Sequence, residues 1–548
     1  MTKNSNVTLQ ITDMTPDGNG IGRTDGGMVV FVPGAVTGDS IRAKIIKAGK
    51  SFCVGRLEEL LSPSGNRVEP DCPHHGRCGG CTFPSLSRTA ELEFKKKLVN
   101  DALERIGALT LRCDEIVYGD AEHYRNKAVY PVSADANGEL FTGFFARRSH
   151  RVVRQDVCLF ENAAFSDIRA YAVGCLTKLG VTAYDESTGR GMLRHIFMRS
   201  SRAGDICLML IMTSDSFAAA GRRFAESLSK RFPAVKSVWL NVNSARTNVI
   251  LGPKTLLLYG ERTLTDTLCG KSFDIGPTAF YQVNPEIAEK LYLKAAEYAQ
   301  VKPGDILLDL YCGAGTIGIC AAADGCRLTG VETVAEAVEN ASANARRNGR
   351  SDGDTLFVCG DASLGAKECA KRFGTPDTVF ADPPRKGLSP EVIETISESG
   401  AHRLVYVSCN PATLARDLAV LEKRGFSALS CCAFDMFPRT GHVETVAVLS
   451  RKSATKTFIP VTVSPKDMGL DEAKAQPTYE NIRKYVKETH GLTVSTLNIA
   501  QMKAECGLEM ECDRSGGKQQ PKCPPEKREA ILDAFRHFGM IEDDSSEG

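Results

Sequence analysis

Residues 305–315, DILLDLYCGAG, decide the fold of this chain. The segment reads as a buried apolar strand that runs into a glycine-rich turn, and the following TIGICAAA reads as a helix. RLTGVE then predicts a second strand, and VAEAVENASANARRNG predicts a helix that ends at a glycine. Further strands are predicted at TLFVC, DTVFADPP, RLVYVSCNP and VETVAVLS. This alternation indicates an α/β fold with a doubly wound parallel sheet, whose ligands bind at the carboxyl ends of the strands.

The chain around this segment is long enough for several domains, at 548 residues with 42% hydrophobic residues. Its formal net charge of +1 excludes a global positive field, so nucleic acid would have to bind through local basic patches. The start, MTKNSNVTLQ, lacks both the basic and the apolar part of a signal peptide, and no apolar run is long enough to span a membrane. We therefore expect a soluble cytoplasmic protein whose 20 cysteines are reduced.

Three further regions flank the α/β domain predicted over 276–451. Residues 1–58 read as short strands punctuated by glycine, which predicts a small OB-like barrel. Its basic side chains either contact a phosphate backbone or form a solvated face. They are Arg23, Arg42, Lys44, Lys47 and Lys50. Residues 59–275 predict a mixed α+β central domain with an amphipathic helix at 86–107. Residues 452–548 predict a linker and an extension of unassigned role, with helices near 478–490 and after Pro525.

The predicted strand ends carry groups suited to a nucleoside. The glycine-rich turn lacks a full GxGxxG pattern and a P-loop lysine, which disfavours a dinucleotide or a triphosphate. Glu332 closes the next strand, where a carboxylate can accept both ribose hydroxyls. Asp361 and Asp382 close two further strands. Together these features point to S-adenosylmethionine.

A thiol and a carboxylate are predicted at the mouth of the same site. SCNP at 408–411 follows the strand RLVYV, and the helix that begins there is expected to lower the pKa of the Cys409 thiol. GHVE at 441–444 brings Glu444 to that mouth. Taken alone, Cys409 reads as a buried structural cysteine and Glu444 as a surface residue. Their position beside a methyl-donor site favours catalytic roles.

Such a pair suits methylation of a pyrimidine carbon. C5 of uracil is a poor nucleophile, so a covalent step is needed: a thiolate adds to C6, C5 attacks the methyl group, and a base removes the C5 proton. Methylation of an exocyclic amine needs neither group, and Arg385 stands where such enzymes often have an aromatic residue.

Five motifs resemble the signature of the RNA 5-methyluridine methyltransferases: FYQVNP at 280–285, DLYCGAG at 309–315, DPPR at 382–385, SCNP at 408–411 and HVET at 442–445. The resemblance covers about residues 7–450 and implies a class I methyltransferase domain with Cys409 as nucleophile and Glu444 as base. It implies a TRAM-type RNA-binding barrel, and a helix 86–107 that packs with the catalytic domain. It also implies that S-adenosylmethionine binds to Gln282, Tyr311, Gly313, Glu332, Asp361 and Asp382, and that Phe280 and Asp382 lie near the target base.

A cysteine cluster is the other strong signal. Cys72, Cys78 and Cys81 have C-x5-C-x2-C spacing in a glycine-rich loop that can wrap a metal. The resemblance implies Cys158 as a fourth ligand and a [4Fe–4S] cluster; zinc is the alternative, because four thiolates suit it equally.

Three functions compete. The first is methylation of uridine C5 in RNA; the barrel together with the cluster resembles the branch that acts on 23S rRNA, and transfer RNA is the alternative substrate. The second is methylation of DNA or of an exocyclic amine, against which the barrel and the pair of Cys409 and Glu444 argue. The third is an RNA-binding ribosome-assembly factor with a relic methyltransferase fold, which the intact motifs disfavour. No obligate protein partner is evident from the sequence.

Overall fold

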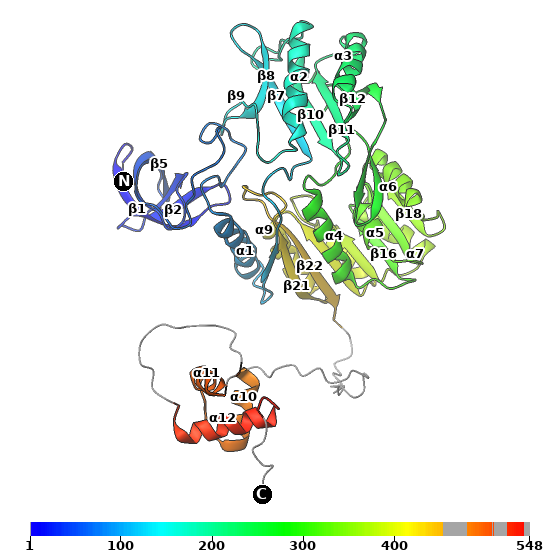
Figure 1. Cartoon of the computed structure of the whole chain (residues 1–548). Helices are drawn as coiled ribbons and strands as arrows, with labels where there is room; N and C mark the ends of the chain where they lie inside the picture. The colour runs from blue at the N-terminus through cyan, green and yellow to red at the C-terminus, as the bar shows by residue number, and fades with distance from the viewer. Residues whose placement is uncertain (1, 453–478, 507, 509–522, 542–548) are drawn as a thin grey trace. The chain divides into compact units, whose positions relative to one another are not determined.

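The computed structural model describes residues 2–452, 479–506, 508 and 523–541, and it separates into two compact units, Met1–Ala454 and Thr455–Gly548 (Figure 1). The linker expected over 451–477 lies outside the described residues from 453 onward. The Gly/Lys/Gln loop expected over 515–522 lies wholly outside them. Within the described ranges, no helix has the length and apolar character needed to cross a membrane.

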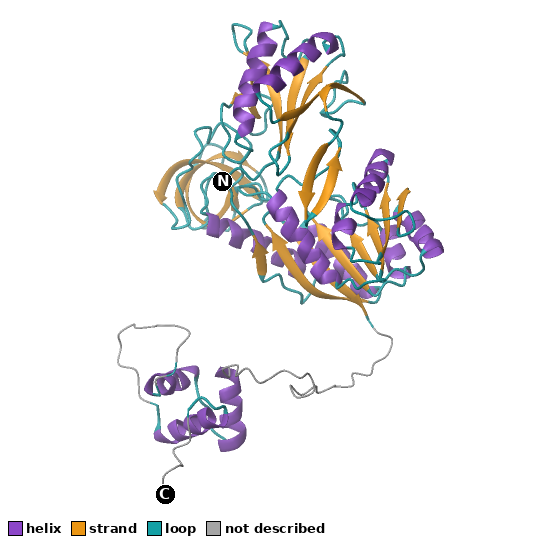
Figure 2. Ribbon diagram, turned by 45° about the vertical axis from the view of Figure 1, so that its right-hand side comes forward, coloured by secondary structure: helices purple, strands orange, loops and turns teal. Residues whose placement is uncertain are grey.

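The N-terminal residues form a closed barrel with the strand order β1-β2-β3-β5-β4 (Figure 2). Its strands are β1 (Asn6–Met14), β2 (Asn19–Arg23), β3 (Val29–Pro33), β4 (Ser40–Ala48) and β5 (Phe52–Ser62). Buried residues alternate with exposed ones, so side chains such as Leu9, Ile11, Val30 and Ile45 fill the interior. Gly20 is needed where β2 passes Ala35, because a Cβ there would lie 2.8 Å from that of Ala35.

The central domain is built on a seven-stranded sheet with the order β13-β12-β11-β10-β7-β8-β9. Helices α2 (Ala164–Lys178) and α3 (Ala218–Arg231) pack on one face of this sheet through a shared apolar core. The strands are β7 (Lys127–Ala134), β8 (Leu140–Phe145), β9 (Val152–Arg154), β10 (Leu193–Ser200), β11 (Ile206–Met212), β12 (Val235–Val242) and β13 (Lys254–Gly260).

The C-terminal part of the larger unit is an eight-stranded sheet with the order β18-β17-β16-β19-β20-β22-β21-β6. The strands from β18 to β20 run parallel, and β22 is antiparallel to both neighbours. The eight strands are β6 (Glu115–Val117), β16 (Ile306–Leu310), β17 (Arg327–Glu332), β18 (Thr355–Cys359), β19 (Thr378–Ala381), β20 (Arg403–Ser408), β21 (Phe426–Phe434) and β22 (Glu444–Arg451). Apolar cores lie on both faces, which is why these strands read as continuous apolar runs.

Helices cover this sheet and a short hairpin precedes it. The helices are α4 (Pro285–Ala299), α5 (Thr316–Ala321), α6 (Ala335–Arg347), α7 (Ala362–Arg372), α8 (Pro390–Glu398) and α9 (Pro411–Lys423). The hairpin consists of β14 (Leu264–Leu268) and β15 (Lys271–Ile275), and β15 contacts α6. Each parallel strand therefore ends beside the start of a helix, the arrangement that places a ligand at the strand ends.

Two elements from before the central domain complete the eight-stranded sheet. Helix α1 (Arg88–Arg105) packs against α9, and β6 (Glu115–Val117) pairs in parallel with β21 at the sheet edge. The sequence pattern placed residues 115–117 with the central domain, because a strand of three residues carries no periodicity that distinguishes it. The central domain is thus inserted between β6 and the rest of this sheet.

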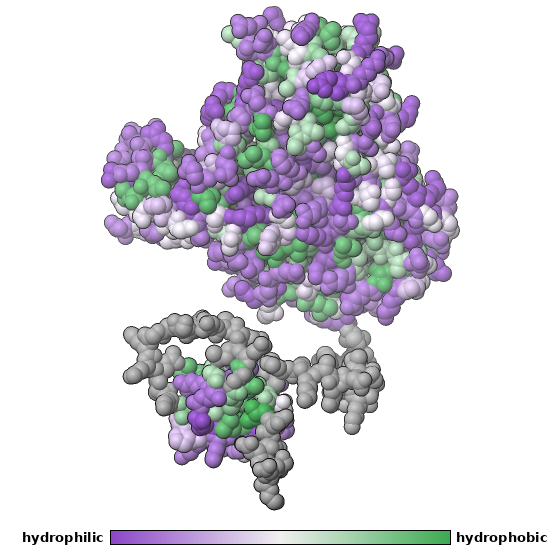
Figure 3. All heavy atoms as spheres, in the orientation of Figure 1, coloured by the Kyte–Doolittle hydropathy of each residue, from purple (hydrophilic) through white to green (hydrophobic). Residues whose placement is uncertain are grey.

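The outer surface of the barrel carries cations and apolar side chains together. Figure 3 shows hydrophobic residues at the barrel surface, and the large exposed ones on β4 and β5 are Ile46, Phe52, Leu60 and Leu61. Arg42 is paired with Glu59 at 2.8 Å, whereas Lys44 and Lys47 form no ion pair with any residue that the structure describes. The basic face expected from the sequence is therefore partly neutralised.

The smaller unit contains α10 (Tyr479–His490), α11 (Thr496–Glu505) and α12 (Pro525–His537). The three helices share an apolar core that includes Ile482, Val486, Ile499, Ile531 and Phe535. The sequence pattern predicts α10 and α12 but not the short α11, which begins at Ser495 with a capping box.

Candidate functional site

The glycine-rich turn after β16 is a tightly bent backbone segment. Tyr311, Gly313 and Gly315 all have positive φ angles, and a Cβ on Gly315 would lie 2.9 Å from the Ile319 side chain. The Asp309 carboxylate accepts a hydrogen bond from the Gly318 amide at 2.9 Å, which fixes the turn to the first residues of α5. The turn therefore presents backbone, with little side chain, at the carboxyl end of β16.

Acidic side chains gather at the same edge of the sheet. Glu332 ends β17, and Asp361 caps α7 just beyond β18 by accepting a hydrogen bond from the Leu364 amide at 2.8 Å. Asp382 follows β19, and burial raises its pKa to about 7. Burial likewise raises the pKa of Asp309 to about 7, and the negative charges of Asp382 and Glu332 add to that rise. The edge is therefore an electronegative surface, suited to hydroxyl, amine or sulfonium groups.

The loop that carries Phe280 and Gln282 is held by the central domain. Arg199 of β10 donates hydrogen bonds to the carbonyls of Gly276 at 3.1 Å and Ala279 at 2.6 Å. Asn126 donates to the Gln282 carbonyl at 3.1 Å. Gln282 is buried, whereas Phe280 is 70% exposed, a rare position for a phenyl ring. Sequence reasoning missed Arg199 and Asn126, because no motif links a central-domain strand to this loop.

Cys409 and Glu444 meet at the carboxyl end of β20. Ser408 of β20 lies opposite Thr445 of β22, so the next residue outward on each strand is Cys409 and Glu444 respectively. Asn410 caps α9 and also donates a hydrogen bond to the Arg385 carbonyl at 3.1 Å. That bond ties the cysteine loop to the loop after Asp382, so the thiol and the two carboxylates share one region.

The electrostatics of Cys409 differ from the expectation of a lowered thiol pKa. Burial raises the pKa of Cys409, the carboxylates of Glu444 and Asp382 raise it further, and Arg385 opposes the rise. Helix α9 begins two residues later, at Pro411, and the Asn410 side chain accepts a hydrogen bond from the Ala412 amide at the start of that helix. The expected lowering is therefore wrong, because burial of the thiol and the two nearby carboxylates all disfavour a thiolate.

Glu444 is a buried carboxyl group, with 6% of its surface exposed. Burial raises its pKa to about 8, Asp382 adds to the rise, and Arg385 opposes it. A carboxylate with this pKa is a much stronger base than a free glutamate. It therefore suits proton removal near neutral pH.

The four predicted metal-binding cysteines line one cavity of about 370 Å³. Cys72, Cys78 and Cys81 lie between β5 and α1, and Cys158 comes from the segment after β9. Burial raises the pKa of Cys81 to about 12, and the other three thiols contribute to that rise. As placed in the described part of the chain, His, Cys, Asp and Glu side chains form no group of three close enough to hold a metal ion. The four cysteines nevertheless line the same cavity, together with His74 and His75.

Comparison with known proteins gives consistent matches. A sequence family described as tRNA (Uracil-5-)-methyltransferase matches residues 87–354 and 369–452, and the TRAM domain matches residues 2–57. An uncharacterized RNA methyltransferase of Oceanobacillus iheyensis is 38% identical over 82% of this chain and 97% of its own length. One of Halalkalibacterium halodurans is 39% identical over 82% of this chain and 98% of its own.

Among solved structures, the Pyrococcus abyssi tRNA (uracil-54, C5)-methyltransferase in complex with S-adenosyl-L-homocysteine is similar to this chain. The TM-score is 0.64 at 24% identity, and the match covers 81% of this chain and 100% of that one. At this identity the likeness shows the fold.

Proposed function

Because this chain belongs to the tRNA (uracil-5-)-methyltransferase family and is an RNA methyltransferase with a TRAM domain, we propose that Cys409 and Glu444 form its catalytic pair. The observation that carries this proposal is that the two groups converge. The Cys409 thiol directly follows β20, and the buried carboxyl group of Glu444 begins β22, the antiparallel strand next to it. The proposed reaction is methylation of uridine C5 in RNA.

Each group has one task in the proposed reaction. The Cys409 thiol releases its proton to water, and the resulting thiolate forms a bond to C6 of the uracil while the electron pair of the C5–C6 double bond moves toward C5 and O4. S-adenosylmethionine, when bound, supplies the methyl group that C5 attacks, and S-adenosylhomocysteine is the leaving group. Glu444 then takes the C5 proton, the double bond re-forms, and the S–C6 bond breaks to release the thiolate. The order explains why a nucleophile and a base must face the same ring.

We propose the edge of β16, β17 and β18 as the methyl-donor site. The bent turn at Tyr311 and Gly313 lets a nucleoside approach the backbone, and Glu332 and Asp361 stand where ribose and adenine would extend. Asp382 lies on the side nearer Cys409, since its charge contributes to the raised pKa of that thiol, and Gln282 is proposed to bind the donor beside it. The exposed ring of Phe280 is proposed to contact the flipped uracil, since a ring held out in solvent gains free energy by stacking on a base.

Two substitutions test the catalytic pair. Cys409→Ala should abolish turnover and leave S-adenosylhomocysteine affinity nearly unchanged, because the thiol contacts the base and not the donor.

Glu444→Gln should still form the adduct and transfer the methyl group, so a covalent protein–RNA species should accumulate on denaturing gels. A Glu444→Gln enzyme that leaves no adduct, or a Cys409→Ala enzyme that still methylates, would refute these roles.

For the substrate, we propose 23S rRNA. The support is the combination of a TRAM barrel with four cysteines around one cavity, which resembles the ribosomal branch. Transfer RNA is the second candidate, favoured by the description of the matching family. Mass mapping of 5-methyluridine in rRNA and tRNA, from cells with and without the protein, separates the two. A nucleoside lost only from tRNA would overturn the rRNA proposal.

We propose that Cys72, Cys78, Cys81 and Cys158 hold a [4Fe–4S] cluster rather than zinc. The cavity they line is large enough for a cluster, and four thiolates occupy all four cluster irons. The cluster is assigned a structural role, and no step of the methylation passes through it.

A further inference from the structure

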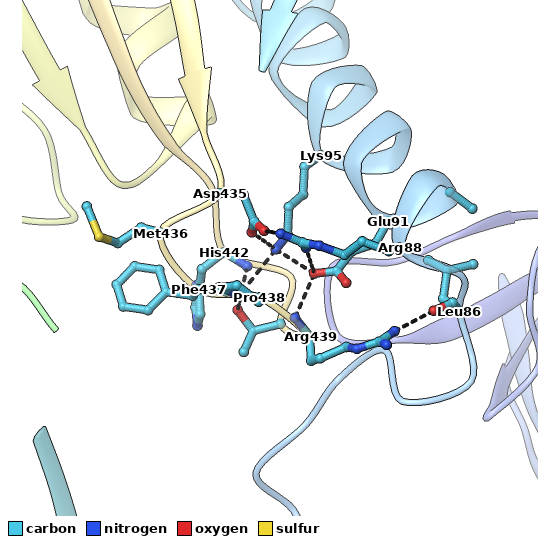
Figure 4. Close-up of polar contacts among 12 residues, drawn as sticks. Leu86, Arg88, Glu91, Lys95, Asp435, Met436, Phe437, Pro438, Arg439 and His442 are labelled. Atoms are coloured by element: carbon cyan, nitrogen blue, oxygen red, sulfur yellow. Dashed lines mark hydrogen bonds and ion pairs between the residues drawn. The ribbon is translucent and has the colours of Figure 1, made fainter. Parts of the chain in front are cut away.

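A network of buried charges lies between α1 and the loop that follows β21 (Figure 4). The side chains of Glu91, Lys95 and Asp435 are completely buried. The Lys95 ammonium lies 2.8 Å from the Glu91 carboxylate and 2.5 Å from that of Asp435. Arg88 pairs with Asp435 from the other side and lies 3.4 Å from Glu91. Two cations thus neutralise two anions within the core.

This network also holds the backbone of the loop. Lys95 donates a hydrogen bond to the Phe437 carbonyl at 3.0 Å, and the Arg439 amide donates to the Glu91 carboxylate at 2.7 Å. The Arg439 side chain in turn donates to the Leu86 carbonyl at 2.7 Å. The loop runs from the end of β21 at Phe434 to the start of β22 at Glu444. Its backbone is therefore fixed five to seven residues before the proposed base.

The other side of the loop forms a wall of the cysteine cavity. Pro438, Arg439 and Thr440 line that cavity together with the four cysteines. The Arg439 carbonyl accepts hydrogen bonds from the amides of Thr82, at 2.8 Å, and Phe83, at 3.1 Å, directly after Cys81. The loop is thus clamped between the buried charges and the cysteine segment, and Arg439, with a positive φ of 65°, belongs to both contacts.

We propose that Lys95 and Glu91 are positioning residues that set the place of Glu444 through this loop. The inference rests on the proposed role of Glu444 as the base. A hydrophobic pair of similar size would fill the same space with no desolvation cost, so a buried ion network is weak evidence for stability alone. Unlike a hydrophobic pair, the charged groups form hydrogen bonds of defined geometry, and these fix the Phe437 carbonyl and the Arg439 amide of the loop. Proton removal is sensitive to such placement, because an error of about 1 Å can lower a rate roughly 100-fold.

The double variant Glu91→Gln/Lys95→Met tests this role. It removes one cation and one anion, so no net charge is left buried, and the pair of Arg88 and Asp435 remains. Single-turnover reactions with RNA and donor would measure adduct formation and adduct resolution separately. We expect resolution to slow about 10- to 100-fold, as in a weaker form of Glu444→Gln, while adduct formation and the KM for RNA change less than about threefold. Methylated adduct should therefore accumulate.

Arg194→Met is the matched control, because Arg194 is also a buried cation that fixes a loop, through the carbonyls of Asn243, Ala245 and Thr247. It should not change the ratio of resolution to formation. Thermal unfolding of each variant identifies the folded ones. If the first double variant does not fold, Arg88→Met/Asp435→Asn, which removes the other pair, is assayed in the same way.

The outcomes separate two errors. If Glu444→Gln accumulates adduct but the folded double variant slows both steps equally, or neither, the positioning role is wrong and the base assignment stands. If Glu444→Gln itself resolves adduct at the normal rate, the proposed base is wrong, and the positioning role is withdrawn with it.

Discussion

Arg385 lies beside the proposed base and the proposed nucleophile, and its charge lowers the pKa of both. Glu444 acts as a base only when ionised, and its pKa is about 8. The rate of adduct resolution should therefore rise with pH through about 8. Arg385→Gln removes the charge that favours ionisation, so the rising limb should move to higher pH. Single-turnover rates between about pH 6.5 and 9.5 measure this shift.

Lys386→Gln provides the control for that measurement, since it removes a neighbouring exposed cation that does not affect the pKa of Glu444. A profile that moves to lower pH in Arg385→Gln, or moves equally in both variants, would contradict the electrostatic account of Glu444.

For single residues, the sequence predicted the positions of Cys409 and Glu444 better than it predicted the pKa of the Cys409 thiol. Cys409 follows the recognisable strand β20 and Glu444 begins the recognisable strand β22, and the end of β20 meets the start of antiparallel β22 at one edge. The prediction of a lowered pKa for Cys409 was wrong, because the sequence shows the helix start but shows neither the burial of the thiol nor the two carboxylates around it. Lys95 gave no signal, since a lysine in an amphipathic helix reads as exposed and its partner is 340 residues away.

Among the elements, the cysteine loop before α1 offers the sharpest test. Protein purified without oxygen should be brown and contain about four iron atoms per chain. Cys158→Ser removes the one ligand from a remote segment and should lower the iron content strongly. Cys175→Ser, on α2 and outside the cavity, should leave it unchanged. Stoichiometric zinc without iron in the wild-type protein would overturn the cluster.

The doubly wound α/β fold and the barrel predicted from the sequence are confirmed. Long apolar strands such as β16 and β20, buried on both faces, left a clear pattern. The elements that were missed are short. Strand β6 has three residues and depends on its pairing with the distant β21, and α11 has ten residues, too few for a helix that is stable without tertiary packing. The β21–β22 register, which decides where Glu444 lies, likewise depends on contacts that the sequence does not display.

For the whole molecule, a net charge of +1 means that RNA must be held by local surfaces. Lys44 and Lys47 on the barrel are available for phosphate, whereas Arg42 is already paired with Glu59. Lys44→Ala/Lys47→Ala should weaken RNA binding and reduce the salt dependence by about one phosphate contact per lysine. Arg42→Ala should change both much less. Titrations with rRNA fragments at several salt concentrations distinguish these cases, and equal effects would refute the distinction.

The smaller unit begins at Thr455, after the matching family ends at residue 452. The matches to the two relatives cover 82% of this chain and 97% and 98% of the relatives' own lengths. Deleting residues 455–548 should therefore leave the rate of methyl transfer and S-adenosylhomocysteine affinity within about twofold, because the residues proposed for chemistry all lie before it. Single-turnover assays on a short RNA measure this. A large loss of the chemical step would place part of the active site in the extension.

The insertion of the central domain has a consequence for the order of folding. The barrel and the central sheet are each made of contiguous residues, so both can fold soon after they leave the ribosome. Helix α1 cannot pair with α9, nor β6 with β21, until about 300 further residues have been synthesised. At the usual rate of about 5–20 residues per second, that wait is roughly 15 to 60 s, during which the apolar face of α1 has no native partner. The catalytic domain is therefore the last part of the larger unit to close. Nascent chains of about 105 to 430 residues contain α1 without its partners, and they expose an apolar surface of the kind that chaperones bind.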